Sequence, residues 1–181
     1  MNTANRDLTA HVMTVVLKWF GDPSSHRKFA RERAELRRAA SEDEACACPG
    51  FFRLLHMVEA AQVVDGEVRR PSCSLTPYER DTLLRLAMLL SRVRANKDNE
   101  PLARQMADDA KGRPKVSELR FRRLLASEGS DAQLRAWRRI IHLLGREINI
   151  ADLTRVMWTW NAKTRKRLAY DYYAHLPQKK G

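Results

Sequence analysis

Apolar residues recur at the spacing of an α-helix along almost the whole of this 181-residue chain, and this pattern limits what it can fold into. Near the start of the chain, Leu8, Val12, Val15 and Trp19 fall on one face of a helix. A Gly-Asp-Pro run at 21–23 would end that helix. The sequence therefore predicts an all-α fold.

Start and stop signals divide this pattern into about eight to nine helices. The expected helices cover 8–20, 25–40, 49–64, 77–93, 102–110, 118–126, 131–144, 153–160 and 162–176. The stretches 41–48 and 66–74 are predicted as loops, and only Val63, Val64 and Val68 hint at a strand pair. We expect one compact bundle, or two small helical lobes, 1–95 and 115–181, joined by 96–114.

Several of these helices carry a capping signal at their first turn. Ser25, Ser117 and Asn161 stand where a side-chain oxygen can accept from a free backbone N–H. Thr76 with Glu79, and Ser130 with Gln133, have the spacing of a capping box.

The charge of the chain indicates an anionic partner. There are 34 Lys and Arg residues against 22 Asp and Glu, which gives a net charge of +12 and a pI near 10.2. Residues 115–181 hold 15 basic and 6 acidic residues, so most of the excess lies in the C-terminal third. The alternative is that the charge serves only the solubility of exposed helix faces.

The common signatures of enzymes are absent from the sequence. The five histidines are scattered, and there is no glycine-rich phosphate loop, nucleophile elbow or zinc-protease motif. Cys46, Cys48 and Cys73 with His56 could supply zinc ligands, but a Cys-x-Cys pair lacks the usual two-residue spacing. We therefore predict no catalysis, no metal, no cofactor and no small-molecule substrate.

The chain shows no sign of a membrane or secreted location. No apolar run approaches the ~20 residues that cross a bilayer, and the first ten residues lack the pattern of a signal peptide. An odd number of cysteines fits reduced thiols. We expect a cytoplasmic protein without a membrane partner.

Basic residues gather on several helices, where they can follow a phosphate chain. The cluster from Lys163 to Arg167 stands in the first turn of a helix, where the helix dipole disfavours cations, and this position favours a ligand. Aromatic residues lie mostly on the apolar stripes and are expected in the core. Trp158 is off its stripe, so we expect it to be exposed or at an interface.

The order and spacing of several motifs resemble the CasB family, the small subunit of the type I-E CRISPR Cascade complex. The motifs are Glu35-Leu-Arg-Arg-Ala39, Phe51-Phe-Arg-Leu-Leu55, Ser117-Glu-Leu-Arg-Phe121-Arg-Arg-Leu-Leu125, Arg138-Arg139 and Ala169-Tyr-Asp-Tyr-Tyr173. The resemblance covers nearly the whole chain. The Cys46/Cys48 loop departs from the usual pattern, as does Arg167-Leu168, where the family often has a Trp.

The resemblance implies a non-enzymatic helical subunit whose partners are crRNA and target DNA, other Cascade subunits and a second copy of itself. It implies contact with the crRNA-target region and support of the displaced strand of the R-loop. The residues that it places at nucleic acid are Arg37, Arg38, Arg53, Arg120, Arg122, Arg123, Arg138, Arg139, Lys163, Arg165 and Lys166. Because guide RNA reads sequence by base pairing, such a protein needs only backbone contacts.

Two hypotheses about function follow. The first is a structural, sequence-independent nucleic-acid-binding subunit of such a complex. The alternative is a helical protein-interaction adaptor, whose basic face docks an acidic partner and has no direct nucleic-acid role.

Overall fold

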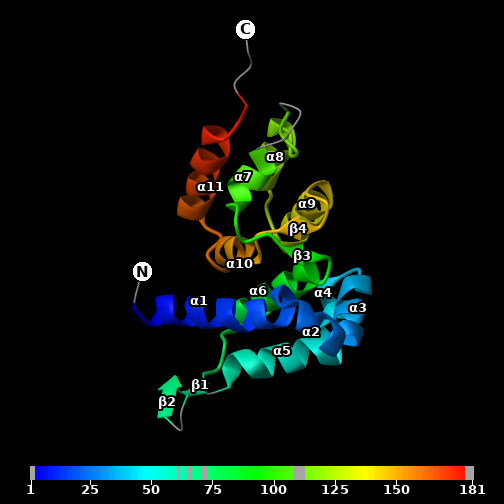
Figure 1. Cartoon of the computed structure of the whole chain (residues 1–181), viewed down its shortest axis with the longest axis vertical. Coiled ribbons are helices and arrows are strands. Elements are labelled where there is room, and N and C mark those ends of the chain that lie inside the picture. Colours follow the sequence, from blue (N-terminus) through cyan, green and yellow to red (C-terminus); the bar gives the residue numbers. More distant parts are fainter. Residues whose placement is uncertain (1–2, 61, 65–66, 71–72, 108–112, 178–181) are drawn as a thin grey trace. The chain divides into compact units, whose positions relative to one another are not determined.

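The computed structural model describes residues 3–60, 62–64, 67–70, 73–107 and 113–177, and it is mostly helical, as predicted. Within these ranges there are eleven α-helices, one π-helical turn and four short strands (Figure 1). The chain divides into two compact units, Met1–Ser91 and Arg92–Gly181. None of the described helices is long and apolar enough to cross a membrane.

The first unit contains six α-helices and a hairpin. Its elements are α1 (Thr3–Val16), the π-helical η1 (Leu17–Gly21), α2 (Pro23–Lys28), α3 (Ala30–Arg38), α4 (Glu42–Cys46), α5 (Pro49–Glu59), β1 (Gln62–Val64), β2 (Glu67–Arg70) and α6 (Pro77–Leu90). The antiparallel pairing of β1 with β2 confirms the hinted strands, and it replaces the predicted end of a helix and part of a loop.

Two predictions for this unit are wrong because local capping differs from the expected pattern. The predicted helix 25–40 is two helices: Asp22, not Ser25, caps α2 by accepting from Ser24 N at 2.8 Å, and the chain bends at Phe29. The predicted loop 41–48 contains α4, because the Ser41 side chain accepts from Glu44 N. The capping box of Thr76 and Glu79 is confirmed.

The core of the first unit is built on aromatic stacking and one close helix approach. Trp19 stacks on Phe29, with ring centroids 3.9 Å apart. Helices α3 and α5 approach closely at Gly50, where a Cβ would lie 2.6 Å from the Cβ of Glu32. Phe51 and Leu54 of α5 are buried, whereas Phe52 is 55% exposed.

The second unit contains the remaining five helices and a parallel strand pair. Its elements are β3 (Ala95–Asn96), α7 (Leu102–Ala107), α8 (Glu118–Leu125), α9 (Ser130–Leu143), β4 (Glu147–Ile148), α10 (Ile150–Trp158) and α11 (Ala162–Ala174). The segment 96–114 thus contributes part of β3 and all of α7 to this unit; 108–112, including the predicted end of that helix, lies outside the described residues.

Two caps of the second unit also differ from the prediction. The expected box of Ser130 and Gln133 does not form, because Ser130 is the first helical residue and Gly129, at φ +75°, is the N-cap. Ser117 is the N-cap of α8, but its side chain makes no capping hydrogen bond. Asn161 caps α11 as predicted, accepting from Thr164 N at 3.0 Å.

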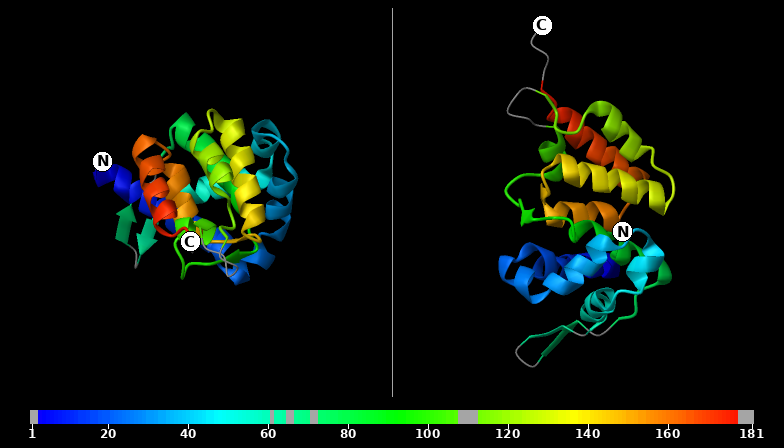
Figure 2. Two further views of the ribbon diagram at one scale, coloured as in Figure 1. Left: turned by 90° about the horizontal axis from the view of Figure 1, so that it is seen from above. Right: turned by 90° about the vertical axis from the view of Figure 1, so that its right-hand side faces the viewer.

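Helices α8 and α11 run antiparallel (Figure 2), and hydrogen bonds join them at both ends. Phe121 stacks on Tyr172 at 3.9 Å between centroids. The Tyr172 hydroxyl donates to the carbonyl of Val116 at 2.6 Å, and Arg165 donates to the carbonyl of Leu125 at 3.1 Å. Phe121 therefore lies on the side of α8 that faces α11.

Candidate nucleic-acid interface

Nearly all of the excess positive charge belongs to the second unit. Residues 92–181 hold 21 Lys and Arg against 10 Asp and Glu, a formal charge of +11, whereas residues 1–91 hold 13 against 12. A surface that attracts phosphate is therefore expected on the second unit.

Helix α9 presents a line of cations to solvent. Leu134, Trp137 and Ile141 lie on its buried side. The opposite side carries Arg135, Arg138, Arg139 and His142, at the i, i+3, i+4 and i+7 positions of one helix face. We call Arg135, Arg138 and Arg139 the α9 arginine stripe. Arg135 was missed by the sequence prediction, although its spacing of three and four residues from the predicted pair is the signal that finds it.

The stripe continues into a hollow between α9 and α8. This cavity has a volume of about 410 Å³ and is lined by Arg120, Arg138, Arg139, His142 and Leu143. Burial of Phe121 and Leu124 orients α8 so that Arg120 reaches the hollow. Arg120 and the Arg138/Arg139 pair, predicted as parts of two different clusters, thus line the same hollow.

Within this group, Arg138 is the least exposed arginine. Burial lowers the pKa of Arg138 below its ordinary value, and the nearby carboxylate of Asp131 opposes that shift. An arginine remains charged at neutral pH despite such a shift. A guanidinium already stripped of part of its water has less hydration to lose when it binds a phosphate.

The other two predicted arginines of α8 lie away from the hollow's lining. Arg122 is turned to Glu118, one turn earlier, at 3.8 Å. Arg123 is exposed, one turn after Arg120. An exposed pair such as that of Arg122 is weak, so it does not prevent Arg122 from exchanging its partner for a phosphate.

The predicted cluster at the start of α11 divides into structural and free cations. Arg165 is half-buried and donates to the carbonyl of Leu125 at the end of α8, so it joins two helices. Lys163 and Lys166 are exposed, and the Lys166 ammonium lies 5.7 Å from the centre of the Tyr170 ring. Of the three predicted cations of this cluster, the two lysines are therefore the ones that are exposed to solvent.

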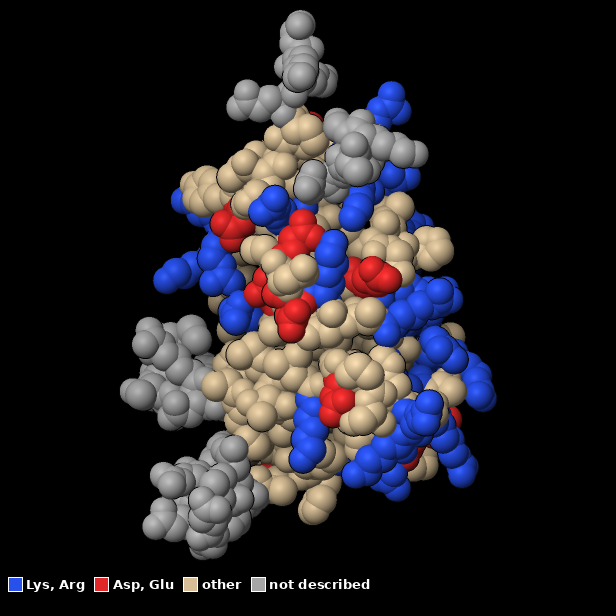
Figure 3. All heavy atoms as spheres, in the orientation of Figure 1, with Lys and Arg blue, Asp and Glu red and all other residues tan. Residues whose placement is uncertain are grey.

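Of the three predicted cations of the first unit, two are exposed and the third is paired with a carboxylate. Arg37 and Arg38 are exposed at the end of α3. Figure 3 shows Lys and Arg side chains gathered over α2 and α3. Arg53 forms an ion pair with Glu32 across α3 and α5, which gives it a role in packing.

Among the aromatic residues, the prediction for Trp158 is wrong. Trp158 is only 8% exposed, because the buried side of α10 is wide and includes Val156 and Met157 as well as Leu153. The large exposed aromatics of the second unit are instead Tyr170 and Tyr173, on α11. Tyr172, between them in sequence, is fully buried.

The candidate zinc ligands do not come together. Among the described residues, no three His, Cys, Asp or Glu side chains are placed to hold a metal ion. Cys46 and Cys48 instead donate to the backbone carbonyls of Asp43 and Glu44. Burial and neighbouring carboxylates raise the pKa of Cys48, which disfavours the thiolate that a metal requires.

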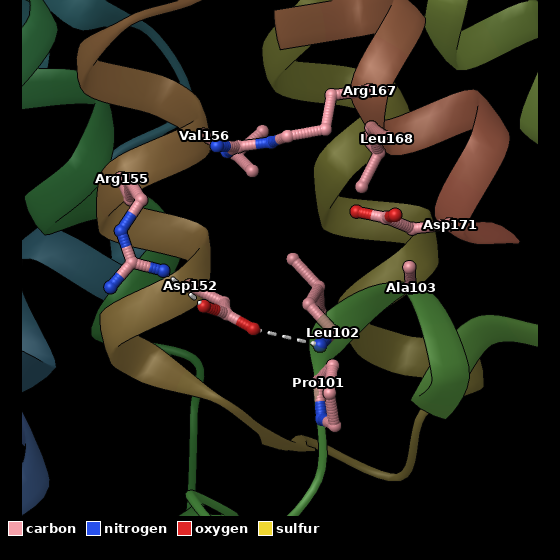
Figure 4. Close-up of a pocket in the computed structure, with 9 residues that line it drawn as sticks. All are labelled: Pro101, Leu102, Ala103, Asp152, Arg155, Val156, Arg167, Leu168 and Asp171. Atoms are coloured by element: carbon pink, nitrogen blue, oxygen red, sulfur yellow. Dashed lines mark hydrogen bonds and ion pairs between the residues drawn. The ribbon is translucent and has the colours of Figure 1, made fainter.

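A second hollow of the second unit carries both signs of charge. It has a volume of about 320 Å³ and lies between α7, α10 and α11 (Figure 4). Asp152 is 2.6 Å from Arg155 and also accepts from the N–H of Leu102. Arg167 and Asp171 complete its charged lining. Because the charges balance, this hollow is a poorer phosphate site than the one beside α9.

Comparison with known proteins identifies the family. The model of the family described as CRISPR-associated protein Cse2 matches residues 32–173. No curated protein matches. A chain in the crystal structure of E. coli Cascade bound to a PAM-containing double-stranded DNA target is similar in fold. The two chains superpose with a TM-score of 0.58 and share 18% sequence identity. The match covers 97% of this chain and 99% of the Cascade chain. The resemblance read from the sequence motifs is thereby confirmed, and this chain belongs to the Cse2/CasB family of CRISPR-associated proteins.

Proposed function

We propose that the chain is a non-catalytic structural subunit of a type I-E CRISPR Cascade complex. In this role it contacts the crRNA-target region and stabilises the displaced strand of the R-loop through its basic helical surfaces. Membership of the Cse2/CasB family and the similarity in fold to a chain of a DNA-bound Cascade support the assembly. Other Cascade subunits and a second copy of this chain are its proposed protein partners.

The observation that carries the nucleic-acid role is the α9 arginine stripe with the hollow beside it. Arg120, Arg138 and Arg139 meet from two helices, and the unit that holds them has a formal charge of +11. Arginine guanidinium groups match the geometry of phosphate oxygens. Such contacts recognise a nucleic-acid backbone whatever its sequence, which suits a subunit beside a guide RNA.

The test removes two exposed charges of the stripe and measures salt dependence. Each phosphate contact on a single strand adds about 0.7 to the slope of log K against log salt. An Arg135→Gln/Arg139→Gln variant should therefore bind a labelled oligo(dT) with a slope about 1.4 less steep than the wild type. Fluorescence anisotropy at several salt concentrations gives both slopes.

The matched control makes the same charge change in the first unit. Lys18 and Arg27 are exposed there, outside the proposed interface, and a Lys18→Gln/Arg27→Gln variant should leave the slope nearly unchanged. An equal decrease of the slope in both variants would mean that net charge alone attracts DNA. That result would refute the role of the α9 arginine stripe.

The same series distinguishes the adaptor hypothesis. An adaptor with no nucleic-acid role would show little affinity for oligo(dT) in any variant. If the Arg135→Gln/Arg139→Gln variant still co-purifies with a crRNA-containing complex, an unchanged R-loop lifetime in that complex would also count against the proposal.

A further inference from the structure

We propose that the outer face of α11 is a stacking platform for unpaired bases, an inference that rests on the proposed nucleic-acid role. We define this face by Lys163, Lys166, Tyr170 and Tyr173, which follow one another at spacings of three, four and three residues. At this spacing the four side chains lie along one side of the helix. At 1.5 Å per residue, the line is about 15 Å long.

The first observation is the exposure of two aromatic rings. Tyr170 is 64% exposed and Tyr173 is 43% exposed, whereas Tyr172 fills the core beside Phe121. Burial therefore accounts for Tyr172 but not for Tyr170. An exposed tyrosine ring offers an apolar face on which another flat ring can stack.

The second observation is that the surroundings hold these rings in place. The Tyr173 ring meets Phe121 edge-on at 6.1 Å and Tyr172 at 5.3 Å. The Lys166 ammonium lies 5.7 Å from the centre of the Tyr170 ring, within the range of a cation-π contact. Rings that are already ordered lose less conformational entropy when a base stacks on them.

The charge of this face favours nucleic acid as the occupant. Lys163 and Lys166 lie in line with the rings, whereas the side chain of Arg167 lines the second hollow (Figure 4). The neighbouring carboxylate of Asp171 is turned toward the second hollow instead (Figure 4). Cations next to exposed aromatic rings on one surface are the combination that binds single strands, since the cations hold phosphates and the rings stack on bases.

The platform predicts a preference for single strands over duplexes. Bases in a duplex stack on each other, and their faces are not available to a tyrosine. A flexible single strand can place a base on Tyr170 while its phosphates approach Lys163 and Lys166. The α9 arginine stripe, by contrast, contacts phosphates that both forms carry.

The experiment compares Tyr170→Ala with Tyr170→Phe in the full chain. The probes are labelled oligo(dT) and a duplex of the same length. Loss of one stacked base should weaken oligo(dT) binding by about fivefold to a hundredfold in Tyr170→Ala. Tyr170→Phe should stay within about twofold because it keeps the ring. Duplex binding should change little in either variant.

Salt dependence separates stacking from charge. Tyr170→Ala should leave the salt slope unchanged, while Lys166→Gln should reduce it by about 0.7. Tyr78→Ala in the first unit is the matched control, because Tyr78 is 61% exposed and should not affect DNA binding. Thermal unfolding of each variant confirms that it folds.

Several outcomes would overturn the platform. Equal losses on oligo(dT) and duplex would refute it, as would a Tyr170→Phe variant as weak as Tyr170→Ala. Normal oligo(dT) binding by Tyr170→Ala, with losses in the α9 variants, would refute the platform and leave the proposed function intact. If that variant bound DNA normally but no longer joined the complex, the face would dock a protein. A wild-type chain that bound neither probe would refute both proposals.

Discussion

Replacement of Tyr172 by phenylalanine tests how the second unit is held together. The Tyr172 hydroxyl donates to the carbonyl of Val116 at 2.6 Å, and both residues are fully buried. The Tyr172 ring stacks on Phe121 at 3.9 Å with an angle of 17° between the planes. Tyr172→Phe keeps this stacking and removes only the hydroxyl, so it isolates one hydrogen bond.

The loss of stability expected for Tyr172→Phe is larger than the contribution of an average hydrogen bond. Removal of the donor leaves the Val116 carbonyl buried without this partner, and such a buried polar group costs about 1–3 kcal/mol. We expect the free energy of unfolding to fall by about 1.5 kcal/mol at pH 8. Tyr172→Ala would cost more, about 3–5 kcal/mol, because it also creates a cavity.

The same hydroxyl predicts a pH dependence. Burial, together with Glu118 and Tyr173, raises the pKa of Tyr172 from 10.0 to about 12. Between these values the unfolded chain loses the proton while the folded chain keeps it, so the folded state loses stability as pH rises. The contribution of the Tyr172 hydroxyl to the free energy of unfolding is complete below pH 10 and falls by about 2 kcal/mol by pH 12.

The difference in the free energy of unfolding between the wild type and Tyr172→Phe isolates this effect, because all other groups titrate in both proteins. The advantage of the wild type should shrink from pH 10 upward and vanish near pH 11, about where the loss by titration equals the hydrogen-bond energy. Urea unfolding followed by circular dichroism at pH 8 to 11.5 measures it. Equal stabilities at pH 8, or a difference that stays constant to pH 11.5, would refute the reasoning.

Two backbone positions allow further tests by urea unfolding. Gly50→Ala should destabilise the first unit by about 1–3 kcal/mol, because the new Cβ would meet the Glu32 side chain at 2.6 Å; no loss would show that α3 and α5 can separate there. Arg146→Gly should stabilise the second unit by about 1 kcal/mol, because Arg146 has φ +66°, which glycine adopts without strain; a loss of stability would show that the Arg146 side chain contributes more than the strain costs.

Helix existence was predictable because its signals are local. The Gly-Asp-Pro break at 21–23, the capping box at Thr76 and the Asn161 cap all depend on residues within one or two turns. The boundaries were less predictable where neighbouring residues compete for the same role. Asp22 caps α2 in place of Ser25, and Ser41 begins a short helix in a stretch expected to be a loop.

The candidate interface was predictable as composition but not as a surface. Counting charges along the chain places the excess in the C-terminal part, and helical spacing alone aligns Arg135 with Arg138 and Arg139. No local pattern shows that Arg53 pairs with Glu32, or that Arg165 reaches the carbonyl of Leu125. These partners are 21 and 40 residues away along the chain.

The sequence by itself determined that this chain is helical, basic and without the usual signatures of catalysis, because periodicity, residue counts and motif spacing are properties of neighbouring residues. Only the tertiary structure decided which cations lie close to one another. The meeting of Arg120 with Arg138 and Arg139, the burial of Trp158 and the exposure of Tyr170 depend on how helices distant in sequence pack. Packing is set by long-range contacts that hydrophobic periodicity does not specify.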